Sequence, residues 1–273
     1  MRRTRLVVTL VLAVLTVLGA TTLTSSPASA AAATKKGVSA ANVAGVNAAL
    51  ADVRAGWFYT WTSHTRGITA PSGVEFVPMI WGPSSVTDTD LNRAKASGTT
   101  LLGFNEPDLA SQANISVERA LDLWPRLQAT GMRLGAPAVA SGGARPGGWL
   151  DRFMSGAAAR GYRVDFIPLH WYGRDFSGAA VGHLRSYLQA VYDRYRKPIW
   201  LTEYGLIDFS GPTPRYPSER EQVDFVRNST AMLRSLPFVE RFAWFTLSTA
   251  TSPTGLYDGS APNASGIAYR AAR

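Results

Sequence analysis

Two glutamates each follow a short apolar run of the kind that ends a buried strand. Glu106 follows Gly103-Phe104-Asn105, and Glu203 follows Trp200-Leu201-Thr202. Partial burial at such a place disfavours the charged form of a carboxyl group, which suits a proton donor at neutral pH. Two facing carboxyl groups can break a glycosidic bond, because one protonates the leaving oxygen while the other attacks the anomeric carbon or activates water. The pair is therefore a candidate for acid/base and nucleophilic chemistry on a sugar.

The two glutamates are 97 positions apart (203 − 106 = 97), so only the tertiary fold can bring them together. Short runs that are apolar on both faces are typical of parallel strands covered by helices. Eight such runs predict strands at Lys36–Ala40, Gly56–Trp61, Glu75–Trp81, Thr100–Asn105, Arg133–Ala140, Asp165–Trp171, Pro198–Tyr204 and Arg241–Leu247. In this order Glu106 closes the fourth strand and Glu203 closes the seventh.

Amphipathic segments separate these strands and predict the helices. They are Asn42–Arg54, Thr87–Ser97, Ser116–Ala129, Gly148–Arg160, Val181–Arg196, Ser218–Ser235 and Ala264–Ala271. Thr62–Gly73 has no helical period, and we expect a loop there. The alternation predicts an α/β fold, a (β/α)8 TIM-type barrel with room for one or two outer helices to be missing. An open doubly wound sheet is less favoured, because no Gly-rich phosphate fingerprint follows any strand.

The start of the chain has the three parts of a secretory signal peptide. Met1–Arg5 is basic, Leu6–Leu23 is apolar, and Ala28-Ser29-Ala30 is a small-residue cleavage site. We therefore expect residues 1–30 to be removed after Ala30 and the protein to be secreted. Residues 31–34 are then a short disordered N-terminus, and residues 35–273 are one catalytic barrel. A retained membrane anchor is the alternative, because the apolar run nearly reaches the roughly 20 residues that span a bilayer.

Composition narrows the classes of function. Loss of the three arginines in the basic start lowers the formal net charge from +9 to +6 (9 − 3 = 6). The remaining basic residues are scattered, so no nucleic-acid partner is expected, nor is stable membrane association after cleavage. The absence of cysteine excludes thiol chemistry and thiolate metal sites. The histidines His64, His170 and His183 lack a metal-ligand spacing, so no metal or cofactor is expected, and no G-x-S-x-G motif indicates a serine hydrolase.

Aromatic residues are abundant, with eight Trp and ten Tyr. Many of them lie near the predicted strand ends, where they can face a cleft. Flat indole and phenol rings suit the apolar C–H faces of sugars and leave their polar tips for hydroxyl groups. Ordinary core packing is the alternative, and it applies to several of these rings.

Seven motifs occur in order, each at a predicted strand end. They are Trp57-Phe58-Tyr59-Thr60-Trp61, Phe76-Val77-Pro78-Met79-Ile80-Trp81-Gly82, Leu102-Gly103-Phe104-Asn105-Glu106-Pro107-Asp108, Gly135-Ala136-Pro137-Ala138, His170-Trp171-Tyr172, Trp200-Leu201-Thr202-Glu203-Tyr204-Gly205 and Ala243-Trp244-Phe245. Together they resemble the Asl1-like glycosyl hydrolase catalytic domain, glycoside hydrolase family 128 of clan A. That family comprises endo-β-1,3-glucanases and their relatives. The resemblance covers essentially all of residues 35–273, and seven ordered matches are far more specific than Asn-Glu-Pro alone.

The resemblance implies a retaining mechanism with two carboxylates. Glu106 is then the acid/base and Glu203 the nucleophile, and their carboxyl groups are expected at the shorter, retaining separation of about 5–5.5 Å. The resemblance also implies that Asn105 hydrogen-bonds the 2-hydroxyl of the sugar being cleaved. Tyr172 or His170 is implied to orient Glu203 or to touch the sugar.

The resemblance further implies aromatic contacts with the substrate. Trp244 is expected to form the floor under the sugar being cleaved, and Trp61 and Trp81 to carry more distant sugars. Further expected contacts are Tyr59, Trp171 and Tyr204.

Other expectations concern single positions and alternatives. Thr60 replaces the Asn that is commoner in the family, which removes an amide from the side of strand two, and Asp108 is expected to cap a loop rather than to catalyse. The expected partner is a polysaccharide or oligosaccharide, and the expected state is a monomer. Two alternatives remain: a cell-wall glycan-binding protein with little or no turnover, and a hydrolase of another β-glycan such as mannan or xylan. Substrate choice depends on loop pockets, which clan-level motifs do not identify.

Overall fold

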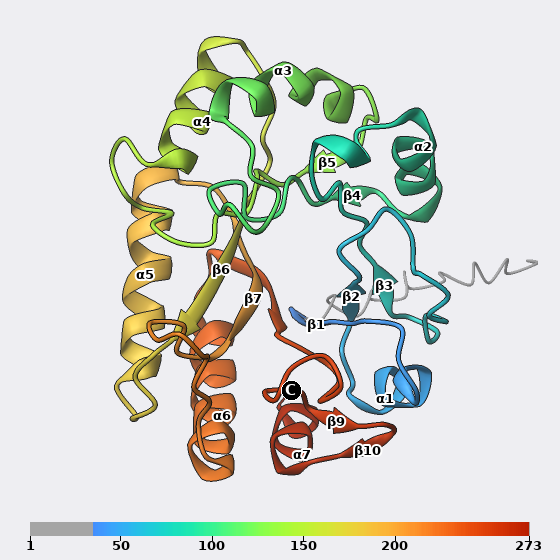
Figure 1. The fold of residues 1–273 in the computed structure, drawn as a ribbon, viewed down its shortest axis with the longest axis vertical. Helices are drawn as coiled ribbons and strands as arrows, with labels where there is room; N and C mark the ends of the chain where they lie inside the picture. The colour runs from blue at the N-terminus through green and yellow to red at the C-terminus, as the bar shows by residue number, and fades with distance from the viewer. Residues whose placement is uncertain (1–34, 273) are drawn as a thin grey trace, which may run out of the picture. The chain divides into compact units, whose positions relative to one another are not determined.

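The computed structural model describes residues 35–272. Its helices lie around a central group of strands (Figure 1), and eight parallel strands pair into a ring. The strands are β1 (Lys36–Ser39), β2 (Trp57–Tyr59), β3 (Glu75–Phe76), β4 (Thr100–Leu101), β5 (Arg133–Leu134), β6 (Ile167–Gly173), β7 (Ile199–Leu206) and β8 (Val239–Trp244). Each corresponds to one of the eight predicted strands, including the first, on which the strand count depends. A short antiparallel hairpin of β9 (Tyr257–Asp258) and β10 (Ala261–Pro262), which the sequence did not predict, follows β8.

The ring closes through two kinds of pairing. Six strands form one sheet in the order β3-β2-β1-β8-β7-β6, and β4 pairs with β5. The bridge between Met79 and Leu102 joins the β3 and β4 segments, and the bridge between Gly135 and Phe166 joins β5 to β6. Strands β3 and β5 are shorter than predicted, and Pro78 and Pro137 lie just beyond their ends. A proline has no N–H to donate, which interrupts a ladder of hydrogen bonds.

Seven α-helices surround the described strands in chain order (Figure 1). They are α1 (Val46–Asp52), α2 (Asp88–Ser97), α3 (Val117–Gln128), α4 (Trp149–Ala159), α5 (Ala180–Tyr195), α6 (Glu219–Ser235) and α7 (Ala264–Ala271), with a 3-10 turn η1 (Pro83–Ser85) before α2. No helix lies between β2 and β3, where residues 60–74 form a loop that contains the predicted one, Thr62–Gly73. The expected TIM-type barrel with a missing outer helix is therefore confirmed.

Capping side chains explain where several helices begin. Ser116 accepts a hydrogen bond from the backbone N–H of Arg119 at the start of α3, and Thr87 does the same for Asp90 in α2. Ser218 and Glu221 form a reciprocal capping box at the start of α6. Helix α1 begins later than predicted because Gly45, at φ 80°, lies in the left-handed region before it.

The interior of the barrel is filled by its own cluster of side chains, separate from the core between strands and helices. Its members are Trp57, Tyr59, Val77, Met79, Leu102, Phe166, Trp200 and Ala243. The ring of Trp200 stacks on Phe166 with centroids 4.3 Å apart, and the guanidinium of Arg241 lies 4.4 Å from the centre of the Trp200 ring. Arg241 also forms an ion pair with Glu75 at 2.5 Å. Bulky side chains thus close the lower barrel and leave the open site at the carboxyl ends of the strands.

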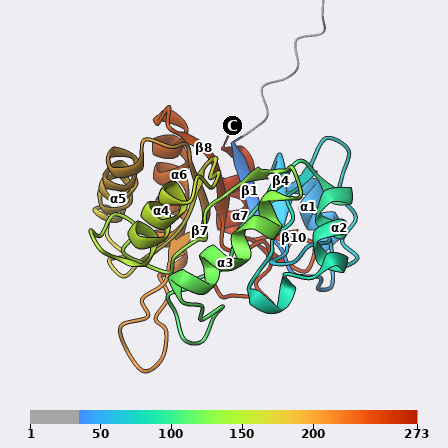
Figure 2. The same cartoon turned by 90° about the horizontal axis from the view of Figure 1, so that it is seen from above.

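Two loops project at the carboxyl-terminal end of the strands, one after β4 and one after β7 (Figure 2). The loop after β7 is held by Asp208 and Arg215, which pair through two backbone hydrogen bonds and a side-chain ion pair. Within residues 35–272, no helix has both the length and the apolar character needed to cross a membrane. The predicted signal peptide, its cleavage site and residues 31–34 lie outside the described residues.

Candidate active site

The fold brings the two glutamates together at the mouth of the barrel. One carboxylate oxygen of Glu106 and one of Glu203 lie within 4.8 Å of each other. Both side chains are almost buried, with 9% and 6% of their surface exposed. The backbone N–H of Glu106 donates to Ala138 O at 2.7 Å, and φ of Glu106 is 41°. A positive φ is uncommon for a residue with a side chain and concentrates at functional sites.

A bulge in β7 aims Glu203 into the barrel. Trp200 points into the barrel, so strict alternation along the strand would place residue 202 inside and Glu203 outside. The register between β6 and β7 shifts after Leu201, so that Glu203, not Thr202, pairs with His170. An extra residue in one strand re-aims the side chains that follow it. The bulge therefore places Glu203 opposite His170 and turns Tyr204 outward.

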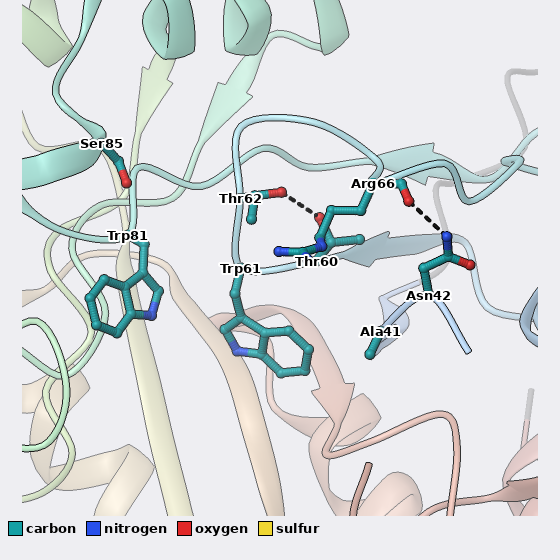
Figure 3. A pocket seen from close by; sticks show the side chains of 8 residues that line it. All are labelled: Ala41, Asn42, Thr60, Trp61, Thr62, Arg66, Trp81 and Ser85. Carbon is teal, nitrogen blue, oxygen red and sulfur yellow. Dashed lines mark hydrogen bonds between the residues drawn. The ribbon is translucent and has the colours of Figure 1, made fainter. Parts of the chain in front are cut away.

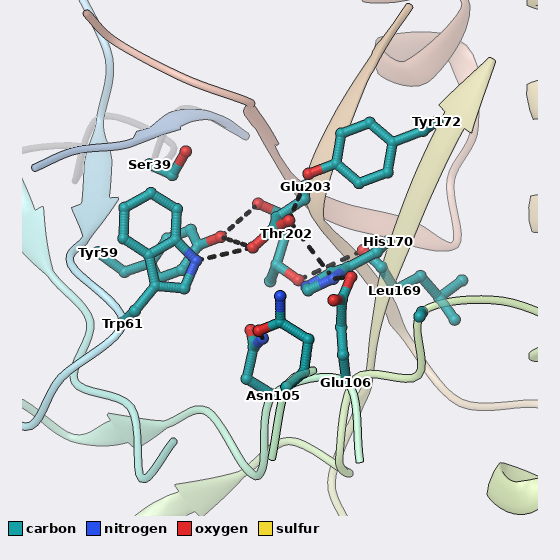
Figure 4. A network of polar contacts seen from close by, with 12 residues as sticks. Ser39, Tyr59, Trp61, Asn105, Glu106, Leu169, His170, Tyr172, Thr202 and Glu203 are labelled. Atoms are coloured by element: carbon teal, nitrogen blue, oxygen red, sulfur yellow. Dashed lines mark hydrogen bonds and ion pairs between the residues drawn. The ribbon is translucent and has the colours of Figure 1, made fainter. Parts of the chain in front are cut away.

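Three neutral donors hold the Glu203 carboxylate (Figure 4). Tyr59 and Trp61 donate to its Oε1 at 3.0 and 2.7 Å, and Tyr172 donates to its Oε2 at 2.5 Å. Burial, followed by the charge of Glu203, raises the pKa of both Tyr59 and Tyr172 well above the usual value of a phenol. Both phenols therefore keep their protons and remain donors, which fixes the position of the Glu203 carboxyl group.

His170 lies between the two carboxylates. Its Nδ1 is 2.8 Å from Glu106 Oε1 and 3.5 Å from Glu203 Oε2, and its ring is completely buried. Burial alone would lower the pKa of His170, but the charge of Glu203 and the hydrogen bond to Glu106 outweigh it and raise that pKa above 6.5. Because Nδ1 faces oxygens of both carboxyl groups, the tautomer with its proton on Nδ1 satisfies both contacts.

The same three residues meet the distance requirement for a metal site, because their donor atoms all lie within 4.8 Å. Their contacts, however, are direct hydrogen bonds. Nδ1 of His170 is engaged with Glu106 at 2.8 Å, and both oxygens of Glu203 accept from Tyr59, Trp61 and Tyr172. A metal-bound imidazole nitrogen has no proton, so this donor set fits proton sharing rather than metal ligation.

A cavity of about 660 Å³ opens above the carboxylates. Its lining residues are Trp61, Trp81, Asn105, Glu106, Leu109, Ser111, Gln112, Ala140, Tyr172, Glu203, Phe209, Phe245 and Thr251. A second cavity of about 590 Å³ shares Trp61 and Trp81 with it and continues over the ends of β1 and β2, where Thr60, Arg66 and Asn42 line it (Figure 3). The two indoles stand at the border of the cavities, which together offer a long site lined by aromatic and polar groups.

Three side chains that were predicted to contact sugar point away from the mouth. Trp244 is fully buried in the layer outside the barrel, where Tyr204 and Tyr269 contact it and its Nε1 donates to Thr254 O at 2.8 Å. Tyr204 lies in the same layer, and Trp171 stacks on Phe225 of α6 with centroids 5.8 Å apart. Successive side chains of a strand point to opposite faces, so the neighbours of inward-facing residues face outward.

Phe245 takes the position that was expected for Trp244. It follows Trp244 by one residue, lines the cavity, and meets the ring of Tyr172 edge-on with centroids 5.4 Å apart. Period-two alternation from Ala243, which faces the barrel interior, could have identified it in the sequence. Phe209 and Leu109, on the two projecting loops, were also missed, since no strand or helix pattern covers them.

Two further predictions concern the segment after β4. Asn105 is buried beside Glu106, and its Nδ2 donates to Gln112 Oε1 at 3.3 Å, while its Oδ1 has no hydrogen-bond partner among the described residues. Asp108 accepts a hydrogen bond from the backbone N–H of Ala140 at 2.8 Å, which ties two loops together as its predicted capping role requires.

Two buried carboxylates at the mouth of a parallel (β/α)8 barrel define a two-carboxylate glycoside hydrolase. The model of the glycosyl hydrolase catalytic core family matches residues 37–269. The chain belongs to this family, and its relatives place it with the Asl1-like domains of glycoside hydrolase family 128.

Similar proteins include both bacterial and fungal relatives. A family 128 (subgroup I) endo-β-1,3-glucanase from Amycolatopsis mediterranei, solved with laminaritriose, is 75% identical with a TM-score of 0.87, over 88% of this chain and 99% of that chain. A subgroup II endo-β-1,3-glucanase from Sorangium cellulosum is 29% identical with a TM-score of 0.74, over 88% of this chain and 99% of that one. Alkali-sensitive linkage protein 1 of Schizosaccharomyces pombe is 31% identical over 200 residues, which span 71% of this chain and 34% of that longer protein.

Variants of the Amycolatopsis enzyme were solved with laminaripentaose, laminarihexaose, or laminaritriose and laminaribiose, each after replacement of one of two glutamates. Those two glutamates are 97 positions apart in that enzyme, as Glu106 and Glu203 are here (203 − 106 = 97).

Proposed function

We propose that this chain is a secreted, retaining endo-β-1,3-glucanase in which Glu106 is the acid/base and Glu203 the nucleophile. The observation that carries the proposal is the approach of the two carboxylates to within 4.8 Å at the barrel mouth. That distance suits a retaining pair, at about 5–5.5 Å, better than an inverting pair, which needs roughly 6.5–9.5 Å to admit water. The matching glutamate spacing and the laminari-oligosaccharide complexes of the 75% identical enzyme support the roles and the substrate.

The reaction follows from the contacts of the two side chains. The Glu203 carboxylate, held in place by its three donors, attacks the anomeric carbon while Glu106 gives its proton to the glycosidic oxygen, and the C–O bond breaks. The product of this step is a glycosyl ester of Glu203. In the second step, the Glu106 carboxylate takes a proton from a water molecule that attacks the same carbon, and Glu203 leaves as a carboxylate. Two inversions give net retention.

The cavity supplies the substrate contacts. Asn105 lies beside Glu106 with an unpartnered Oδ1, which can accept a hydrogen bond from a sugar hydroxyl such as the 2-hydroxyl. Trp61 and Trp81 present aromatic surface where the two cavities meet, and Phe209 and Leu109 add apolar surface from the projecting loops. A site formed by two adjoining cavities has room for several sugars, which suits cleavage within a chain rather than at its end.

Digestion of laminarin tests the proposal. The purified protein should release laminari-oligosaccharides of several sizes, and Glu203→Ala should lower kcat by several orders of magnitude, because the covalent route is lost. Glu219→Ala, which removes an exposed carboxylate on α6, is the matched control and should be fully active. Full activity of Glu203→Ala would refute the nucleophile, and release of sugar only from mannan or xylan would refute the substrate.

Binding without turnover is a separate outcome of this experiment. Tight retention on laminarin with no product after long incubation would favour a cell-wall glycan-binding role. Secretion is tested by expression of the full chain with a C-terminal tag: the proposal requires a product in the medium whose N-terminus follows Ala30, and a tagged product that remains with the membrane fraction would favour the anchor.

A further inference from the structure

The bridging position of His170 carries a further inference, which rests on the proposed function. The ring has no exposed surface, and Nδ1 lies within 2.8 Å of Glu106 and 3.5 Å of Glu203. Its Nε2 has no hydrogen-bond partner among the described residues. Among the described residues, the polar contacts of this histidine are therefore with the two reacting carboxylates, so its role must be sought in their chemistry.

The negative charge of the site moves from one carboxylate to the other during the first step. Glu203 loses its charge when its oxygen forms the ester bond, and Glu106 gains a charge when its proton goes to the leaving oxygen. One negative charge is present before and after the step, and only its position changes. A donor that faces both carboxylates can stabilise the charge at both positions without moving.

We propose that His170 is a positioning residue that acts through Glu106, whose carboxyl group its Nδ1–H orients and whose carboxylate it stabilises once the proton has been donated. The shorter of its two contacts is with Glu106, and Glu203 has three other donors. Among the described residues, no other group forms a hydrogen bond with the Glu106 side chain. Loss of His170 therefore removes a donor that Glu106 has nowhere else, whereas Glu203 keeps its own.

The electrostatic surroundings agree with this role. The acidic groups that act on His170 are Glu203 on β7, Glu106 after β4 and Asp108 in the loop beyond it. The phenols of Tyr59 on β2 and Tyr172 on β6 stay protonated and add no charge. The largest charged influences on the ring are therefore all acidic, and the imidazole N–H faces the carboxylates on which the negative charge moves.

Leaving-group dependence distinguishes this role from a structural one. Cleavage of laminarin requires protonation of the leaving oxygen, whereas 2,4-dinitrophenyl β-laminaritrioside releases a phenolate that needs no proton. His170→Leu should lower kcat/KM on laminarin about 10- to 150-fold, the loss expected for one hydrogen bond to a charged group. On the dinitrophenyl substrate the loss should be less than about threefold, since no charge develops on Glu106. His170→Asn restores an N–H donor near the position of Nδ1 and should recover part of the laminarin activity.

Matched variants keep the outcomes separate. His183→Leu replaces an exposed histidine on α5 and should leave both rates unchanged. Glu106→Ala should show the same preference for the activated substrate. If Glu106→Ala shows that preference and His170→Leu loses both rates equally, or loses neither, the inference about His170 is overturned and the proposed function stands. If Glu106→Ala shows no preference, the acid assignment itself fails. Should His170→Leu not fold, the comparison of the two substrates with His170→Asn decides, because that variant retains a polar side chain.

Discussion

Removal of one hydroxyl group from Tyr172 tests how the nucleophile is held. Tyr172→Phe deletes the donor to Glu203 Oε2 at 2.5 Å and keeps the ring, which packs edge-on against Phe245 and Phe209. A hydrogen bond to a charged group contributes about 1.5–3 kcal/mol. Since 1.36 kcal/mol corresponds to a factor of ten in rate, kcat/KM on laminarin should fall about 10- to 150-fold. Tyr59 and Trp61 still donate to Oε1, so the carboxylate remains buried with partners and the enzyme should stay folded.

The assay compares initial rates of reducing-end release from laminarin for wild type, Tyr172→Phe and Tyr195→Phe. Tyr195 is the matched control, because its hydroxyl donates to Gly143 O at 3.0 Å on the outer helix α5, away from the carboxylates. Its loss should leave kcat/KM within about twofold of wild type. Equal activity of Tyr172→Phe and wild type, with unchanged thermal unfolding, would refute the reasoning that this phenol holds Glu203 for attack.

Three other predictions address the loops, the barrel and the buried histidine. Phe209→Ala removes a side chain that is 57% exposed at the cavity edge, so KM for laminarin should rise several-fold with unchanged Tm. Gly103→Ala adds a Cβ only 2.8 Å from Gly135 O and should lower the free energy of unfolding by about 1–3 kcal/mol in urea titrations, whereas Gly182→Ala, which meets nothing within 4 Å, should not. Burial lowers the pKa of His170, but Glu203 and Glu106 raise it above 6.5, so the ionised ring stabilises the folded state fully below pH 6.5 and less as pH rises through the raised pKa. The Tm difference between wild type and His170→Leu should therefore narrow as the pH rises above 6.5 through the raised pKa, and a widening would contradict that direction.

Much of the fold is predictable because hydrophobic patterns and caps are local. The eight apolar runs gave the strand order, and side chains such as Thr87 and Ser116 marked helix starts that the structure has. Strand lengths were less predictable, because they depend on where neighbouring backbones can exchange hydrogen bonds. The hairpin of β9 and β10 was missed for a similar reason, since each strand has only two residues and no period can be detected.

The sequence predicts some of the site residues better than others, and the geometry of the strands explains why. Glu106 and Glu203 follow from their places at strand ends, but contact with sugar was also assigned to neighbours that alternation turns outward, such as Trp244. Glu203 points inward because of the bulge in β7, and no residue type in the sequence predicts that bulge. His170 was identified as a site residue, yet its distances to both carboxylates required three strands in register.

The stereochemistry of the first product tests the central claim most directly. Laminarin digested inside an NMR tube by enough enzyme to outpace mutarotation shows the anomeric configuration of the new reducing ends as they form. Two carboxylate oxygens within 4.8 Å predict double displacement, so the β-anomer should appear first and the α-anomer should grow in only by mutarotation. Initial release of the α-anomer would contradict the retaining mechanism and, with it, the role of Glu203 as the nucleophile.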